Sequence, residues 1–78
     1  MLKKKLTLII TFATTTQAMA MEKFCAEEYL PGRLIPVPRQ ITAGCGLAWK
    51  AQPQDKEGLI HALTAAGMQW EQCHIIEV

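Results

Sequence analysis

Apolar and polar residues alternate near the start of the chain, and this pattern predicts a strand. Between Leu6 and Phe12 every second residue is large and apolar, and two of the residues in between are threonines. A period of two is typical of a strand that packs one face against a core. Thr14, Thr15 and Thr16 follow, and because threonine is a favoured N-cap, a helix is expected to begin there.

Apolar residues then recur at helical spacing in residues 17–30, QAMAMEKFCAEEYL. A helix over this segment would turn one stripe toward the core and leave Glu22 and Lys23 in water. The stripe consists of Ala18, Met21, Cys25 and Tyr29. Pro31 and Gly32 are expected to end the helix.

Two prolines place the next predicted strand, residues 33–38, at the edge of a sheet. Pro36 and Pro38 would lack N–H groups on the same side of the strand, which a central strand could not tolerate. Residues 47–51, LAWKA, predict a further strand that contains no proline.

A second helix is expected after Pro53, with Asp55 as its N-cap and Gly67 at its end. Its inward-facing residues would be Leu59, Leu63 and Ala66. Residues 70–78, WEQCHIIEV, then predict a short closing strand.

The predicted order of elements is strand–helix–strand–strand–helix–strand. Right-handed crossovers and the adjacency of neighbouring elements favour a ferredoxin-like βαββαβ two-layer sandwich, an α+β fold. Its antiparallel sheet would carry both helices on one face, with the second and fourth strands at the edges, in agreement with the prolines. The other face would be open to solvent. It would show Thr7, Ile9, Thr11, Ala48 and Lys50.

Composition narrows the class of protein. With 78 residues, half of them hydrophobic, and a net charge of +1, the chain is expected to form one small ordered domain over residues 1–78. Neither a basic excess nor an aromatic platform for nucleic acid is present. The three cysteines lack the spacing of a disulfide framework or a zinc site. They are interpreted as free thiols in a reducing compartment.

The first twenty residues imitate a secretory signal, with three lysines, an apolar run and Ala18-Met19-Ala20 as an A-x-A site. We favour a strand because Thr7 and Thr11 interrupt the apolar run. Cleavage would also remove the most strand-like segment of the chain. The run is too short to span a bilayer.

Cys45 stands between Gly44 and Gly46, and glycines offer a thiol little packing but a backbone that can bend. In the predicted topology this loop lies at the same end of the sheet as Thr14, Thr15 and Thr16. A helix N-terminus favours an anion, so these residues would stabilise a thiolate, and Arg39 is a candidate cation for the same purpose. The alternative interpretation is a tight hairpin with Cys45 as a small filler.

The other two thiols have ordinary explanations. Cys25 lies on the inward stripe of the first helix and is expected in the core. Cys73 and His74 are strand neighbours, which point to opposite faces, so they are not expected to chelate a metal. Neither a metal nor a cofactor is predicted.

Three stretches together resemble a family of small bacterial domains, the selenium/sulfur carrier protein-like family. They are LIITFATTTQAMAMEK, PGRLIPVPRQITAGCGLAW, and the closing helix and strand. The most specific part is LIPVPR, residues 34–39, followed by Gly44-Cys45-Gly46. The resemblance implies a cytoplasmic protein that carries sulfur or selenium on the cysteine matching Cys45.

Two functions remain open at this stage. The first is a thiol carrier that takes sulfur or selenium from a donor enzyme such as a cysteine desulfurase and passes it to an acceptor protein. Such a carrier would not turn over as an enzyme. The second is an interaction module that binds a partner protein, or itself as a homodimer, through the open sheet face or the edge of the fourth strand. Neither function involves nucleic acid or a membrane.

Overall fold

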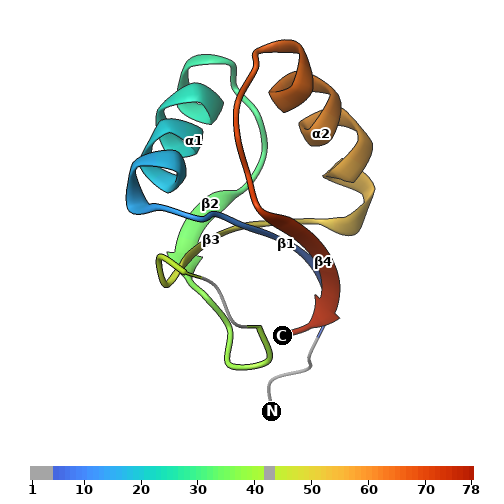
Figure 1. Ribbon diagram of the computed structural model, residues 1–78. Helices are drawn as coiled ribbons and strands as arrows, with labels where there is room; N and C mark the ends of the chain where they lie inside the picture. The colour runs from blue at the N-terminus through green and yellow to red at the C-terminus, as the bar shows by residue number, and fades with distance from the viewer. Residues whose placement is uncertain (1–4, 42–43) are drawn as a thin grey trace.

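The computed structural model describes residues 5–41 and 44–78. It is a small α+β structure in which strands and helices follow one another in the expected order (Figure 1). The elements are β1 (Leu6–Thr11), α1 (Thr15–Glu27), β2 (Arg33–Pro36), β3 (Leu47–Ala51), α2 (Lys56–Ala65) and β4 (Gln72–Glu77), with a 3₁₀ turn, η1 (Pro53–Asp55), before α2.

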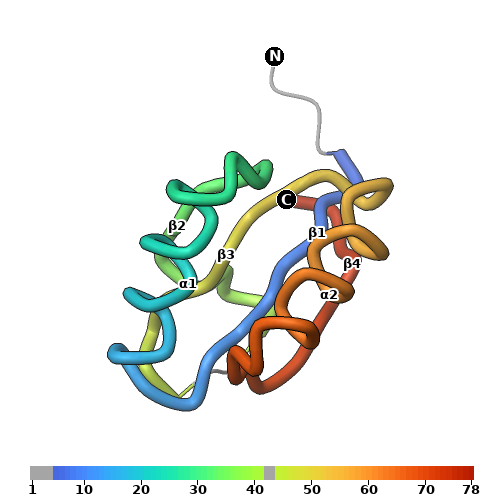
Figure 2. Tube along the Cα trace, turned by 90° about the horizontal axis from the view of Figure 1, so that it is seen from above, coloured from blue at the N-terminus to red at the C-terminus, as the bar shows by residue number. Residues whose placement is uncertain are grey.

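The four strands form one sheet in the order β2-β3-β1-β4, and each strand is antiparallel to its neighbours. The two edges are therefore β2 and β4, as the prolines and the predicted topology indicated. Both helices lie on the same face of the sheet (Figure 1). Seen from above, α1 lies on the side of β2 and β3, and α2 on the side of β1 and β4 (Figure 2).

The main core lies between this sheet face and the helices. Large side chains from β1, from the residue that follows it, from β3 and from both helices fill it, and they are almost completely removed from solvent. Its largest members are Leu8, Ile10, Phe12, Met21, Trp49, Leu59 and Leu63. Burial of apolar surface on this scale is the dominant stabilising contribution to a small domain.

The opposite sheet face is covered, so the prediction of an open face is wrong. The described residues of the β2–β3 loop that follow β2, residues 37–41, lie along that face (Figure 1). Ile41 from this loop forms a second core with Ile9 and Ala48, which are both 0% exposed. The Gln40 side-chain amide donates a hydrogen bond to the carbonyl of Glu77 at 3.2 Å, which ties the loop to β4.

This cover explains the burial of β1 on both faces. Thr7 and Thr11 were expected in solvent, but they are 6% and 0% exposed. The Thr11 hydroxyl accepts a hydrogen bond from the Gln72 amide at 3.1 Å, which satisfies its polar group. In the signal-like stretch, residues 6–11 form β1 and residues 15–20 form the start of α1, and residues 1–4 lie outside the described residues.

Helix α1 ends differently from the prediction, whereas α2 ends at the predicted Gly67, which has a φ of 70°. The backbone of Tyr29 adopts a φ of 55°, and the Leu30 amide donates a hydrogen bond to the carbonyl of Cys25 at 2.9 Å. Helix α1 therefore ends before Pro31. Tyr29, expected on the inward stripe, is 94% exposed. In α2, Leu59 and Leu63 are buried as expected, but Ala66 lies past the helix end and is exposed.

Two local predictions also need correction. Pro38 lies beyond β2 and begins a turn, because the Ile41 amide donates to its carbonyl at 3.0 Å. Asp55 is the N-cap residue of α2 by position, but its carboxylate accepts from the backbone N–H of Gln52, at 3.1 Å, inside the 3₁₀ turn. None of the helices in the described part of the chain is long and apolar enough to cross a membrane.

Candidate functional site

The turn that contains Cys45 lies beside the connection from β1 to α1. A Cβ atom at Gly44 would stand 3.1 Å from the carbonyl oxygen of Ala13, so a larger residue would crowd this contact. Gly46 has a φ of 74°, a left-handed conformation that favours glycine. Steric constraints thus favour glycine at both positions. The predicted role of Gly44 and Gly46 in loop flexibility stays a prediction.

The Cys45 sulfur is half-buried and is held by the backbone two residues farther along. The Leu47 amide donates a hydrogen bond to Sγ at 3.4 Å, and the thiol can donate to the Leu47 carbonyl at 3.5 Å. The Leu47 N–H is thus a backbone donor at the sulfur that the sequence did not reveal.

The start of α1 is held by its own side chains. Thr14 Oγ1 accepts a hydrogen bond from the Gln17 amide at 3.2 Å, which confirms Thr14 as the N-cap. Gln17 Oε1 in turn accepts from the Ala13 amide at 3.0 Å. The structure brings this helix end next to the Gly44 turn. That Thr14, Thr15 and Thr16 act on the Cys45 thiol stays a prediction.

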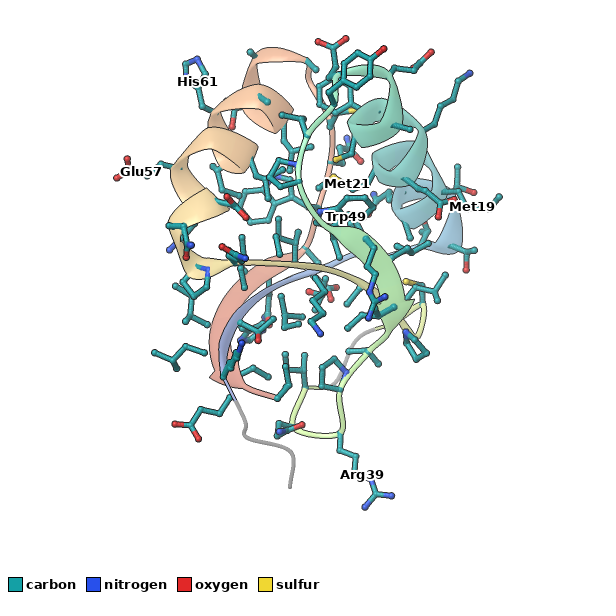
Figure 3. The ribbon with its side chains drawn as sticks, turned by 180° about the vertical axis from the view of Figure 1, so that it is seen from behind. Met19, Met21, Arg39, Trp49, Glu57 and His61 are labelled. Atoms are coloured by element: carbon teal, nitrogen blue, oxygen red, sulfur yellow. The ribbon has the colours of Figure 1, made fainter. Side chains whose placement is uncertain are left out.

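Arg39 lies at the tip of the β2–β3 loop, away from the start of α1. Its side chain is exposed and points outward from the body of the protein (Figure 3). The loop base is closed by a backbone hydrogen bond from Val37 to the carbonyl of Gly46, at 2.9 Å. In this arrangement Arg39 is directed into solvent, and its predicted stabilisation of a Cys45 thiolate stays a prediction.

The remaining thiols are less suited to reaction. Cys25 is 2% exposed, and burial raises its pKa to about 11. Burial also raises the pKa of Cys73, although nearby Lys56 acts in the opposite direction. Since the thiolate is the reactive form, both cysteines are expected to be unreactive near neutral pH.

Cys73 and His74 point to opposite faces of the sheet, as predicted. Cys73 packs against the main core, whereas His74 pairs with Ile9 on the face covered by the β2–β3 loop. The His74 ring nitrogen Nε2 lies 2.9 Å from the Gln72 side-chain oxygen. Within residues 5–41 and 44–78, no group of three or more metal-ligating side chains comes together.

Comparison with known proteins adds one finding to this geometry. No curated protein and no solved structure gives a significant match. One family model matches, over residues 7–75, and its description is "Putative Se/S carrier protein-like". The matched residues include both helices, all or most of each strand, the Gly44-Cys45-Gly46 turn, and Ile41, which covers the second face of the sheet. Because it spans most of the sequence, this chain belongs to the Se/S carrier protein-like family.

Proposed function

We propose that this protein carries sulfur or selenium as a persulfide-type adduct on Cys45. The observation that carries the proposal is the position of the Cys45 sulfur, half-buried in a turn and accepting the Leu47 N–H at 3.4 Å. The raised pKa values of Cys25 and Cys73 support the choice of this thiol. Membership of the family supports the class of cargo.

Loading is a thiol exchange without net oxidation. The Cys45 thiolate attacks the outer sulfur of a persulfide on the donor enzyme, for which a cysteine desulfurase is the proposed class. The bond between the two donor sulfurs breaks while a new bond to Cys45 forms, and the donor cysteine leaves as a thiolate. A donor that holds selenium in the outer position reacts in the same way.

Delivery reverses the roles. A nucleophile on the acceptor protein attacks the outer atom of the adduct, and Cys45 leaves as a thiolate. The Leu47 N–H stabilises this leaving group, because its hydrogen bond strengthens as negative charge returns to Sγ. The exchange uses no cofactor, and the protein acts as a carrier rather than a turnover enzyme.

The proposal includes an architecture and a location. The order β2-β3-β1-β4, with one helix after β1 and one after β3, supports a ferredoxin-like arrangement. Three free cysteines support a reducing compartment, for which we propose the cytoplasm.

Intact-protein mass spectrometry tests the carrier function. The protein is incubated with a cysteine desulfurase and cysteine, beside the variants Cys45→Ser and Cys73→Ser. The wild type and Cys73→Ser are expected to gain the mass of one sulfur atom, which reductant removes, and Cys45→Ser is expected to gain none. Replacing cysteine by selenocysteine in the same assay compares the two cargoes.

Equal labelling of Cys45→Ser and the wild type would show that another thiol accepts the sulfur. Absence of any gain in the folded wild type would overturn sulfur acceptance from this donor class. Circular dichroism of all three proteins verifies that they are folded.

A second candidate function is self-association through the edge of β4. The edge strand β2 has four residues, contains Pro36 and carries Arg33, features that discourage pairing. In contrast, β4 has six residues and neither proline nor lysine, and its Ile75 is 44% exposed. An apolar edge of this kind is a template for another strand.

The register of the sheet defines how two copies would pair. Lys5 and Val78 exchange both backbone hydrogen bonds, at 3.4 and 3.2 Å. Alternation along an antiparallel ladder then directs the backbone groups of Cys73, Ile75 and Glu77 outward. A twofold axis at Ile75 would place it opposite its own copy and Cys73 opposite Glu77, with no like charges opposed.

Sedimentation velocity tests this second function. Wild-type protein is compared with Ile75→Lys and with Met19→Lys, a control because Met19 is also an exposed apolar residue, at 59%, but lies on α1. Concentration-dependent dimers of the wild type and Met19→Lys, and monomers of Ile75→Lys, are expected. A wild type that stays monomeric up to millimolar concentration would overturn the proposal.

A further inference from the structure

A cleft of about 510 Å³ lies where β1 starts and β3 ends. This end of the sheet is opposite the end that carries the Cys45 turn. Residues 5–7 at the start of β1 and residues 50–52 at the end of β3 line it, together with residues 31–33 before and within β2. Cys45 precedes the start of β3, and Ala13 follows the end of β1. The cleft is thus separate from the proposed sulfur site, and its function is argued independently.

Positive charge dominates the cleft. Among the described residues, its lining includes the basic side chains of Lys5, Arg33 and Lys50, against one carboxylate side chain, that of Asp55. This carboxylate already accepts a hydrogen bond from the Gln52 backbone N–H at 3.1 Å. The surplus charge would attract an anion.

The sheet register places two of the cations directly against each other. Arg33 and Lys50 are cross-strand partners in the β2–β3 ladder, so their side chains leave the same face of the sheet. Like charges in this relation repel and destabilise a sheet. The next residues in the same row, Ile9 on β1 and His74 on β4, supply no carboxylate to compensate.

A bound dianion would turn this repulsion into attraction. Arginine offers a planar set of donors that suits two oxygens of a phosphate or carboxylate, and lysine adds a point charge. The volume of the cleft falls in the range of sites for small molecules.

We propose that this cleft binds a small phosphate monoester, with the phosphate between Arg33 and Lys50 and with Lys5 on the same face of the sheet. Two adjacent cations match a phosphate dianion better than a single carboxylate. The volume of about 510 Å³ leaves room for an organic group beside the phosphate, which favours an ester over inorganic phosphate. We assign binding of this ligand and no reaction of it, because charge and volume support the assignment and no lining residue is given the role of a nucleophile.

Nuclear magnetic resonance titration with phenyl phosphate tests the site. Amide signals of Gly32, Arg33, Lys50 and Gln52 are followed at constant ionic strength maintained with sodium chloride. Saturable shifts are expected at these residues, with weaker binding of inorganic phosphate and weaker binding of benzoate, which carries one charge.

Matched variants separate a defined site from general attraction to a basic surface. The double variant Arg33→Gln/Lys50→Gln is compared with Arg39→Gln/Lys23→Gln, which removes the same charge from exposed positions outside the cleft. We expect the first pair to raise the dissociation constant on the order of tenfold or more, and the second pair to leave it nearly unchanged.

Equal weakening by the two double variants would overturn the site, because it would show a response to net charge alone. Wild-type shifts that do not saturate, or that spread over the whole surface, would overturn it as well. Thermal unfolding verifies the fold. Removal of the Arg33–Lys50 repulsion is expected to keep or raise stability, so loss of binding would not reflect loss of structure.

Discussion

The backbone conformation of Gly46 positions a hydrogen-bond donor beside Cys45, the residue proposed to carry the cargo. The φ of 74° at Gly46 lets the chain turn so that the Leu47 amide lies 3.4 Å from the Cys45 sulfur. A residue with a Cβ atom would be strained in this conformation. Gly46 therefore matters for the position of the Leu47 donor more than for contacts of its own, because nothing lies within 4 Å of a Cβ atom built on it.

Gly46→Ala is expected to lower the free energy of unfolding by about 1–2 kcal/mol, the cost of a left-handed conformation for an L-residue. It should also slow alkylation of Cys45, since relief of the strain would move the Leu47 N–H. Urea unfolding and iodoacetamide labelling measure the two effects.

Gly58→Ala is the matched control, because Gly58 lies in α2 with open space around it. In a helix this exchange should stabilise by roughly 0.5–1 kcal/mol. A Gly46→Ala variant as stable and as reactive as the wild type would contradict the role given to the angle.

The buried Cys25 thiol makes stability depend on alkaline pH. Its pKa is raised by burial from 9.0 to about 11, so the unfolded chain loses this proton at lower pH than the folded protein. The stabilising contribution is complete below pH 9 and is lost as pH rises toward about 11. For a shift of this size the loss is roughly 2–3 kcal/mol.

Urea unfolding at several values between pH 8 and about 11 measures this loss. Other groups titrate in the same range, so the informative quantity is the difference between the wild type and Cys25→Ala. We expect the variant to be less stable at pH 8 and to lose less stability on alkalinisation. Parallel pH curves for the two proteins would contradict the assignment to Cys25.

At the scale of single elements, the end of α1 stores conformational strain. Tyr29 follows the helix in a left-handed conformation, with a φ of 55°, at a position where glycine is common. Its ring is 94% exposed and so gains little from burial. The exposed ring therefore does not offset the cost of the backbone conformation.

Tyr29→Gly is accordingly expected to stabilise the protein by about 1 kcal/mol, because glycine adopts this conformation without a steric cost. Tyr29→Ala retains the strain and should show no such gain. Thermal unfolding of the two variants beside the wild type decides the matter. An equal effect of glycine and alanine would assign it to the ring instead.

The elements themselves were largely predictable, but not all of their ends were. Alternation in residues 6–12 identified β1, and the prolines correctly put β2 at an edge, because both signals depend on residue type. The end of α2 at Gly67 was predicted correctly, whereas the end of α1 depends on a left-handed Tyr29, a residue type that gives no such signal. The same holds for the Leu47 N–H, since a backbone donor has no sequence signature.

At the scale of the whole molecule, the β2–β3 loop acts as a third layer. Its Ile41 is 8% exposed and packs on Ile9 and Ala48, while Gln40 reaches Glu77 on the far edge. The sequence predicted an open face because the cover comes from an irregular segment with no periodicity. The path of such a segment across a sheet follows from tertiary packing alone.

Ile41→Ala is expected to lower the free energy of unfolding by about 2 kcal/mol, as for other truncations of buried isoleucine. Ile75→Ala is the control, since Ile75 is 44% exposed and should cost much less. Urea unfolding of dilute protein compares the two. Equal, small losses would show that the loop does not contribute to the core.

The central place of β1 has a consequence for how the protein is made. This strand is synthesised before every other element, yet its two partners, β3 and β4, come late in the chain. On the ribosome, the segment LTLIIT must therefore wait as an unpaired, apolar and β-prone stretch. During that interval its apolar side chains stay exposed, and they are covered only when β3 and β4 have been made and the sheet closes.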